Sequence, residues 1–311
     1  MANFLVTGGA GFIGSHLVRK LLALGHRVRV LDDLSSGRLQ NLQEVEGRFE
    51  WLQADAADSI KAREAMRGVH GVFHLAATPS VNLSIEDPFQ NQHSGEVATL
   101  AILDAARRSS VRRVVFSSSA AVYGDVGDNP ISEDTETRPI TPYAVSKRTG
   151  EDYCRVFSNL NPELETVALR YFNVFGLRQS PLSSNCGVVT IFMRCLRERI
   201  QPTIFGDGHQ TRDFVEVANV VAANIAAMES PKFFRGECFN VGSGTSVAIV
   251  DLWNHLKEIA QSDLTPQFQH VRVGEIKHSR ADISKIARIL DFRPDIGWKE
   301  GLTRLWKSGA I

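Results

Sequence analysis

Leu5-Val-Thr-Gly8-Gly9-Ala-Gly11-Phe-Ile-Gly14-Ser15 lies near the start of the 311-residue chain and decides its fold. The apolar run Phe4-Leu5-Val6 predicts a buried strand, and the pattern from Ser15 to Leu24 predicts a helix directly after the glycines. Read from Gly9, the glycines follow Gly-x-Gly-x-x-Gly. This spacing makes a tight turn, lets the backbone approach a pyrophosphate and aims a helix N-terminus at the anion.

An acidic residue completes the dinucleotide pattern. Asp32 follows the strand predicted over Val28–Leu31 and stands eighteen residues after Gly14. A carboxylate there accepts both ribose hydroxyls of an adenosine and repels a 2′-phosphate, so we predict NAD rather than NADP. The alternative interpretation is a glycine-rich turn with an incidental aspartate. Asp55 is predicted to contact the adenine, and His74 is interpreted as a core or strand-end histidine rather than a catalyst.

Short apolar runs alternate with helical patterns through the first two-thirds of the chain. The runs predicted as parallel strands include 4–6, 28–31, 72–75, 114–116 and 167–169. The alternation predicts an α/β fold with a doubly wound parallel sheet of the Rossmann type. From about Gly176 the pattern breaks into loops and shorter pieces, which predicts a smaller lobe. Residues 1–175, rejoined by 215–242, are expected to form the NAD-binding domain, and 176–214 with 243–311 the substrate lobe.

Composition excludes several classes of protein. Apolar residues make up 43% of the chain, enough for a core, and the 35 basic residues balance the 35 acidic ones. No global field therefore favours nucleic acid or an anionic membrane. No apolar run reaches the roughly 18 residues that span a bilayer, and we expect residues 1–14 to form a strand and turn and not a secretory signal. We expect a cytoplasmic protein without a metal site, with Cys154, Cys186, Cys195 and Cys238 as buried free thiols.

A second motif carries reactive groups. Tyr143 and Lys147 are four residues apart in Pro142-Tyr-Ala-Val-Ser-Lys147, so on a helix the phenol and the ammonium share a face. A nearby cation lowers a tyrosine pKa from about 10 toward the working pH. Such a tyrosine removes a proton from an alcohol while a hydride acceptor takes the hydrogen from carbon. The spacing alone is typical of a solvated helix face, but the glycine turn supplies a hydride acceptor.

Further motifs occur along nearly the whole chain. In the first half they are Gly8-Gly-Ala-Gly-Phe-Ile-Gly14, Phe116-Ser-Ser-Ser119-Ala-Ala-Val-Tyr-Gly124 and Tyr143-Ala-Val-Ser-Lys147. In the second half they are Leu169-Arg-Tyr-Phe-Asn173-Val-Phe-Gly176, Phe205-Gly-Asp-Gly208, Arg212-Asp-Phe214 and Arg272-Val-Gly-Glu275 followed by Ala281-Asp-Ile-Ser-Lys285. The first set resembles the extended short-chain dehydrogenase/reductase family, in the family's order, and the second its nucleotide-sugar branch, in particular the UDP-hexose 4-epimerases.

The resemblance implies a role for each matching residue. Tyr143 would be the catalytic base, Lys147 would lower its pKa and bind the nicotinamide ribose, and Ser119 would hydrogen-bond the sugar 4-oxygen. The implied NAD site is Gly8, Gly11, Phe12, Ile13, Gly14, Asp32, Asp33, Ser35, Ser36, Gly37, Asp55, Ala56, Leu75, Ala76, Ala77, Tyr143, Lys147 and Tyr171. The implied UDP-sugar site is Ser80, Ser118, Ser119, Asn173, Val188, Thr203, Phe205, Arg212, Arg272, Glu275 and Ser279.

Within that set, Asn173, Arg212 and Arg272 are implied to hold the diphosphate, because guanidinium forks suit phosphate oxygens. Phe205 and the backbone around Thr203 are implied to hold the uracil. Surface cations and a strand-end turn residue remain the alternative interpretations of the two arginines and of Asn173.

Departures from related families narrow the chemistry. Related dehydratases carry two acidic residues directly after the serine. Related decarboxylases carry a glutamate at the second of these two positions. This chain has Ala120 and Ala121 there, so dehydration and decarboxylation are disfavoured. Within the epimerase pattern, Glu275 stands where an aspartate is usual and Gly95 where an asparagine is frequent.

Ser279 bears on substrate choice, because a tyrosine at this position is associated with plain hexoses. The small serine predicts room for an N-acetyl group, and hence UDP-GlcNAc and UDP-GalNAc as substrates, alongside UDP-Glc and UDP-Gal. A UDP-glucuronate 4-epimerase is the nearest rival, with His278 or Arg280 meeting the carboxylate. A non-catalytic nucleotide-sugar scaffold and a net keto-sugar reductase are the others. The family also implies a homodimer through helices around Ala98–Arg108 and from near Tyr143.

Overall fold

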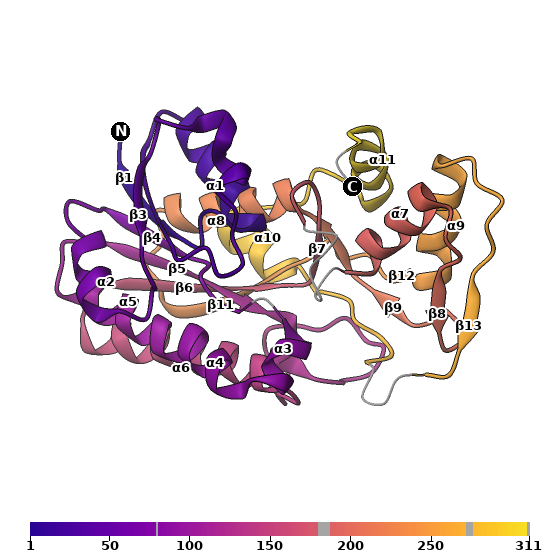
Figure 1. The fold of residues 1–311 in the computed structure, drawn as a ribbon. Coiled ribbons are helices and arrows are strands. Elements are labelled where there is room, and N and C mark those ends of the chain that lie inside the picture. Colours follow the sequence, from indigo (N-terminus) through magenta and orange to yellow (C-terminus); the bar gives the residue numbers. More distant parts are fainter. Residues whose placement is uncertain (79, 180–186, 272–275, 310–311) are drawn as a thin grey trace.

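The computed structural model describes residues 1–78, 80–179, 187–271 and 276–309. Within them, seven parallel strands form one sheet in the order β11-β6-β5-β4-β1-β2-β3 (Figure 1). The strands are β1 (Asn3–Thr7), β2 (Arg27–Asp32), β3 (Glu50–Gln53), β4 (Gly71–His74), β5 (Arg113–Ser119), β6 (Glu165–Tyr171) and β11 (Arg235–Val241). The predicted doubly wound parallel sheet is confirmed.

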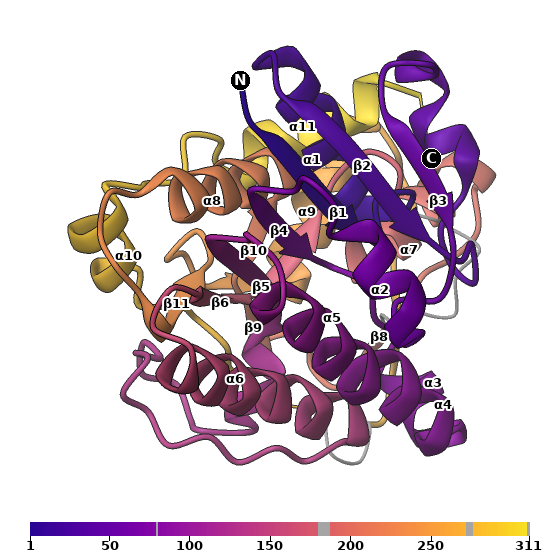
Figure 2. The same cartoon turned by 90° about the vertical axis from the view of Figure 1, so that its left-hand side faces the viewer.

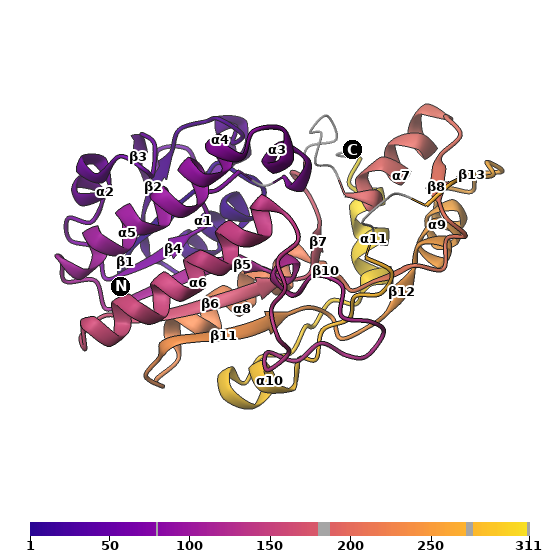
Figure 3. The same cartoon turned by 90° about the horizontal axis from the view of Figure 1, so that it is seen from below.

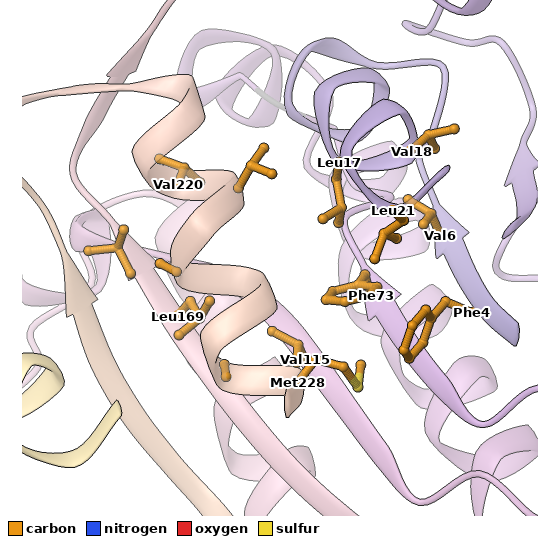
Figure 4. Close-up of a cluster of buried hydrophobic side chains, with 14 of the residues drawn as sticks. Phe4, Val6, Leu17, Val18, Leu21, Phe73, Val115, Leu169, Val220 and Met228 are labelled. Carbon is orange, nitrogen blue, oxygen red and sulfur yellow. The ribbon is translucent and has the colours of Figure 1, made fainter. Parts of the chain in front are cut away.

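Helices cover both faces of this sheet (Figure 2). One face carries α1 (Phe12–Ala23), α8 (Val217–Glu229) and α10 (Ser284–Leu290), and the other α2 (Ser59–Ala65), α5 (Ala98–Arg107) and α6 (Pro142–Leu160). Alternate strand residues serve the two cores: Phe4 and Val6 lie in the first and Leu5 in the second. Figure 4 shows Leu17 and Leu21 of α1 pointing into the first core.

Shorter helical pieces connect these elements. They are η1 (Leu39–Val45), α3 (Val81–Glu86), α4 (Pro88–Gln92), the π-helical turn η2 (His93–Val97) and η3 (Ala120–Tyr123). Cys154 and Cys195 are buried thiols and Cys238 is half-buried, whereas Cys186 lies outside the described residues. No helix in the described part of the chain is both long and apolar enough to cross a membrane.

A third core lies beyond the sheet, at the right of Figure 1. Its centre is the pair Phe192 and Trp253, whose rings meet edge to face at 5.3 Å. The elements of this region are α7 (Val188–Glu198), α9 (Ile249–Ile259), α11 (Trp298–Lys307) and the strand pairs β7 (Asn173–Phe175) with β10 (Phe214–Glu216), β8 (Thr203–Phe205) with β13 (Gln267–Gln269), and β9 (Thr211–Arg212) with β12 (Val247–Ala248).

The predicted domain boundaries stay a prediction. α8 and β11, from the segment expected to return to the NAD-binding domain, pack on or pair with the large sheet. α10 falls in the segment assigned to the substrate lobe, yet its Ile286 and Leu290 belong to the sheet core. The helix packs there because its short apolar face meets β11.

The strand order fixes where a ligand can bind. β1 lies between β2 and β4, so the chain leaves β1 toward one side of the sheet and returns on the other. In such sheets the connections diverge at this point and open a crevice outside the carboxyl ends of the strands. Thr7 and His74, the last residues of β1 and β4, are paired at this edge.

Candidate active site

The glycine turn closes tightly against the end of β4. Gly8 has φ +67°, and a Cβ added to it would lie 2.8 Å from the amide nitrogen of Ala76. A Cβ on Gly14 would lie 2.1 Å from the carbonyl oxygen of Gly8, which no backbone could tolerate. α1 begins at Phe12 after Gly11, with neither a side-chain cap nor an acidic residue in its first turn. Its amide groups are therefore suited to an anion, and the turn fits a pyrophosphate.

Asp32 is buried at the end of β2, beside this turn. Its Oδ2 accepts from the Ala10 amide at 2.9 Å and its Oδ1 from the Leu34 amide at 2.8 Å. Burial raises the pKa of Asp32, and these two hydrogen bonds oppose the shift. A Cβ on Gly37 would lie 2.8 Å from Asp32 Oδ1, so the chain returns directly over the carboxylate. The arrangement fits the predicted adenosine ribose site.

The neighbouring predicted residues form exposed turns. Asp33 accepts from the amide and hydroxyl of Ser35 at 2.9 and 2.6 Å, and Ser36 follows on the surface. Asp55, predicted to contact the adenine, pairs through Oδ2 with His93 Nε2 at 2.7 Å. Next to it, Ala56 is buried.

A buried hydrogen-bonded chain holds the turn after β4. Thr99 Oγ1 donates to the Gly95 carbonyl at 2.6 Å, so it accepts from His74 Nε2 at 3.1 Å. His74 Nδ1 then accepts from Thr7 Oγ1 at 2.7 Å, and Thr7 Oγ1 accepts from the amides of residues 75 and 76. Burial lowers the pKa of His74 to about 3, which keeps the ring neutral.

These hydrogen bonds support the interpretation of His74 as a core residue. They also explain how Leu75, Ala76 and Ala77, all in the predicted NAD site, are placed beside the glycine turn. The contributions of Thr7 and Thr99 were missed from the sequence, where isolated threonines give no signal of a shared hydrogen bond.

Ser119, Tyr143 and Lys147 come together at the carboxyl end of β5. Tyr143 stands in the first turn of α6, which Thr141 caps by accepting from the Ala144 amide at 3.2 Å. The Ser119 side chain is close enough to the Tyr143 hydroxyl to favour its ionised form. Lys147 Nζ lies 5.8 Å from the centre of the Tyr143 ring and donates to the Ser117 carbonyl at 2.8 Å.

The pKa of Tyr143 differs from the expectation. Burial raises it, and the Ser119 side chain opposes the shift only in part. Burial also lowers the pKa of Lys147 to about 8. Among the protein's own groups, desolvation therefore outweighs the attraction that the spacing of the two residues led us to expect. A further positive charge beside the phenol would be needed to favour the phenolate.

Ser118 lies on the other face of β5, where sequence reasoning did not place it. Its hydroxyl donates to Glu151 Oε1 at 2.6 Å, and Arg170 donates to both oxygens of Glu151 at 2.8 and 2.7 Å. Ser118 therefore links the strand to α6 in a buried network instead of presenting its hydroxyl beside Ser119. Tyr171, predicted near the nicotinamide, is buried and bonds to Ser117 Oγ at 3.0 Å.

The predicted diphosphate residues meet where β7 pairs with β10. The Asn173 amide donates to the Asp213 carbonyl at 3.0 Å, directly after Arg212. Arg212 is half-buried, and its Nη1 donates to the Thr211 carbonyl at 2.9 Å. Arg272 and Glu275 lie outside the described residues.

The remaining substrate positions are spread around this pair. Thr203 and Phe205 are half-buried at the two ends of β8, and Val188 opens α7. Ser80 is buried, and its hydroxyl caps α3 by accepting from the Leu83 amide at 2.9 Å. Ser279 is half-buried.

Residues 4–242 match the NAD dependent epimerase/dehydratase family. The chain belongs to this family. It is 39% identical over 304 residues to the UDP-glucose 4-epimerase of Mycolicibacterium smegmatis, covering 96% of each chain.

Two solved structures are also similar over nearly their whole length. One is a UDP-N-acetylglucosamine 4-epimerase from Methanobrevibacter ruminantium M1 in complex with UDP-N-acetylmuramic acid, with a TM-score of 0.93, 36% identity and coverage of 98% of this chain and 97% of that one. The other is a UDP-glucuronic acid 4-epimerase from Bacillus cereus in complex with UDP-glucuronic acid and NAD, with a TM-score of 0.91, 31% identity and coverage of 98% of each.

The family's cofactor, NAD, agrees with the glycine turn and with the acceptors of Asp32. When bound, NAD supplies a hydride acceptor and a cationic nicotinamide ring. That positive charge would add to the charge of Lys147 in favouring the Tyr143 phenolate.

Replacing Lys147 tests its burial. The folded pKa of about 8 lies below the ordinary value of 10.5, so between these values the unfolded chain holds a proton that the folded protein does not. The cost of burying the ammonium is complete below pH 8 and falls as pH rises. We expect the stability advantage of Lys147→Met over wild type to shrink by about 2 kcal/mol from about pH 7.5 to 9.5. Urea unfolding measures it; the exposed control Lys20→Met should show no such trend.

Proposed function

We propose that the protein is an NAD-dependent 4-epimerase of UDP-sugars that interconverts UDP-GlcNAc and UDP-GalNAc, and also UDP-Glc and UDP-Gal. The observation that carries the proposal is the grouping of Ser119, Tyr143 and Lys147 at the strand end that faces the glycine turn. Relatives named for 4-epimerisation of UDP-sugars, similar over the whole chain, support it.

The side chains divide the reaction among them. With NAD bound as hydride acceptor, Tyr143 takes the proton from the sugar 4-hydroxyl while Ser119 holds the 4-oxygen. The 4-keto sugar then turns about its diphosphate and presents its other face. Tyr143 returns the proton as the hydrogen returns to carbon 4. Substrate and product are at the same oxidation level, so no external reductant is consumed.

The turn after Ser119 favours epimerisation over the dehydration and decarboxylation that related enzymes carry out. Ala120 and Ala121 begin η3, and the Ala121 amide donates to Ser119 Oγ at 3.2 Å. Elimination of water from carbons 5 and 6 needs a further acid and base, and methyl groups supply neither. We therefore propose that the sugar leaves with its carbon skeleton and oxygens intact.

The sugar itself is a finer proposal. The half-buried Ser279 is small, which supports an N-acetylated sugar. A UDP-glucuronate 4-epimerase stays the second candidate, favoured by the likeness to such an enzyme. Incubating the protein with a panel of UDP-sugars without added cofactor, with products identified by NMR, decides between them. A keto-sugar reductase would instead consume NADH, and a scaffold would bind without turnover.

Tyr143→Phe removes the proposed proton carrier. We expect the epimerisation rate to fall by about 10²–10⁴-fold, because phenylalanine has no hydroxyl to take and return the proton. Bound NAD and folding should be unchanged. NMR of the product mixture measures the rate, and Tyr153→Phe on the same helix serves as the control. A Tyr143→Phe protein as active as wild type would overturn the mechanism.

Ser279→Tyr fills the space proposed for the acetamido group. We expect kcat/KM for UDP-GlcNAc to fall by about tenfold or more while that for UDP-Glc changes little, because only the former carries the bulky group at carbon 2. The control is Ser284→Tyr, at an exposed position on α10. An unchanged kcat/KM for UDP-GlcNAc would sink the assignment.

We also propose a homodimer in which α5 and α6 pair with their copies. The two helices lie side by side on one face of the sheet (Figure 3). Apolar side chains on them are exposed, including Leu100 at 39%, Val145 at 46% and Val156 at 45%. A second copy packed on these two helices would remove such side chains from water.

An aspartate on one of these helices should break the dimer. We expect Leu100→Asp to elute as a monomer in size-exclusion chromatography with light scattering, because a charge would be buried without a partner. Leu39→Asp, at a similarly exposed position away from these helices, should leave the mass at two chains. A monomeric wild-type protein contradicts the proposal.

A further inference from the structure

Ser279 lies on a segment that runs beside β9. On its amino-terminal side, the Thr211 amide donates to the Lys277 carbonyl at 2.9 Å. Thr211 Oγ1 also lies 3.0 Å from His278 Nδ1, within hydrogen-bond distance. The residues just before Ser279 are thus tied to the strand that ends in Arg212.

Asp213 ties down the other side of the segment. Its carboxylate is fully buried, and Oδ2 accepts from the amides of Ala281 at 3.0 Å and Gly244 at 2.9 Å. Oδ1 accepts from the amide and the hydroxyl of Ser243 at 2.6 and 2.7 Å. All four contacts are donors, so the ionised carboxylate satisfies each of them, and an amide in its place could not.

The backbone around the Asp213 carboxylate is closely packed. A Cβ on Gly242 would lie 2.7 Å from both Asp213 Oδ2 and the Cβ of Ala281. On its far side the segment pairs with Ile131, whose amide donates to the Arg280 carbonyl at 2.8 Å. Ile131 holds the segment to the sheet domain. Thr211 and Asp213 set its position relative to Arg212.

We infer that Thr211 and Asp213 are positioning residues that fix the distance between the diphosphate grip at Arg212 and the sugar pocket at Ser279, and so set which group at carbon 2 is accepted. This rests on the proposed function. Arg212 lies between these two residues, so the two anchors of the segment that carries Ser279 flank the residue proposed to hold the nucleotide. Loosening either anchor should change selection between sugars more than it changes binding of UDP.

A double-mutant cycle between positions 213 and 279 tests the coupling. Asp213→Asn keeps the volume, but in either orientation its NH2 group faces at least one backbone amide and loses an anchor. We expect the loss of kcat/KM for UDP-GlcNAc caused by Ser279→Tyr to be at least about fivefold smaller in the Asp213→Asn background, because the released segment can move away. Asp251→Asn, exposed on α9 of the same region, should combine additively.

Binding of UDP alone, measured by calorimetry, separates positioning from general damage. We expect its Kd to change by less than about threefold in Asp213→Asn, because Arg212 keeps its own strand contacts. If Asp213→Asn does not fold, Thr211→Val, which removes the hydroxyl that meets His278, takes its place in the same cycle. If the wild-type protein epimerises UDP-sugars but the effects of the two substitutions are additive, this inference alone is overturned. A wild-type protein that epimerises no UDP-sugar overturns the proposed function first.

Discussion

The close backbone contact between the glycine turn and the end of β4 is the constraint on which the site depends. Gly8 can meet Ala76 only because it has no Cβ and takes a positive φ. The contact brings the start of α1 to the crevice between β1 and β4, where parallel sheets bind ligands. The side chains of His74 and Thr7 hold this edge of the sheet in place. Their buried hydrogen-bond donors, the Thr7 hydroxyl and His74 Nε2, are both paired. A dinucleotide is thereby received by backbone whose position the core already determines.

Helix α6, which carries Tyr143 and Lys147, is held by comparable buried contacts with the next strands of the sheet. Glu151 stands one turn after Lys147 on α6 and joins Arg170 and Ser118 in a buried charged network. Removing one partner would leave a buried charge without compensation, so the network resists any shift of the helix along β5 and β6. Because Ser119 comes from β5 and Tyr143 from α6, the placement of one beside the other depends on this register. The contacts that stabilise the helix therefore also set the geometry proposed for catalysis.

Much of the fold followed from the sequence, because buried strands and glycine turns have local patterns. The strand runs, the helix after the glycines and the spacing of Tyr143 and Lys147 needed no knowledge of partners distant in the chain, whereas the grouping of Ser119 with them came from the family resemblance. The pKa of Tyr143 could not be foreseen, since desolvation depends on everything packed around the phenol. Ser118 was misplaced because three serines in a row give no sign of which faces which side. Asp213 was passed over because its partners lie 30 and 68 positions away.

Chemistry and selectivity therefore occupy separate parts of the structure. Tyr143, Ser119 and Lys147 belong to the rigid sheet and its helix, where a proton can be moved at a fixed point. The proposed nucleotide contacts belong to short strand pairs whose spacing depends on single side chains such as Asp213. In the proposed mechanism the sugar rotates to present its other face, so the protein can hold it only loosely. The nucleotide must therefore be held firmly. Ser279, the proposed selectivity residue, lies on a segment beside β9 and not on the sheet, so the proposed pocket for carbon 2 can vary without disturbing Tyr143 and Ser119.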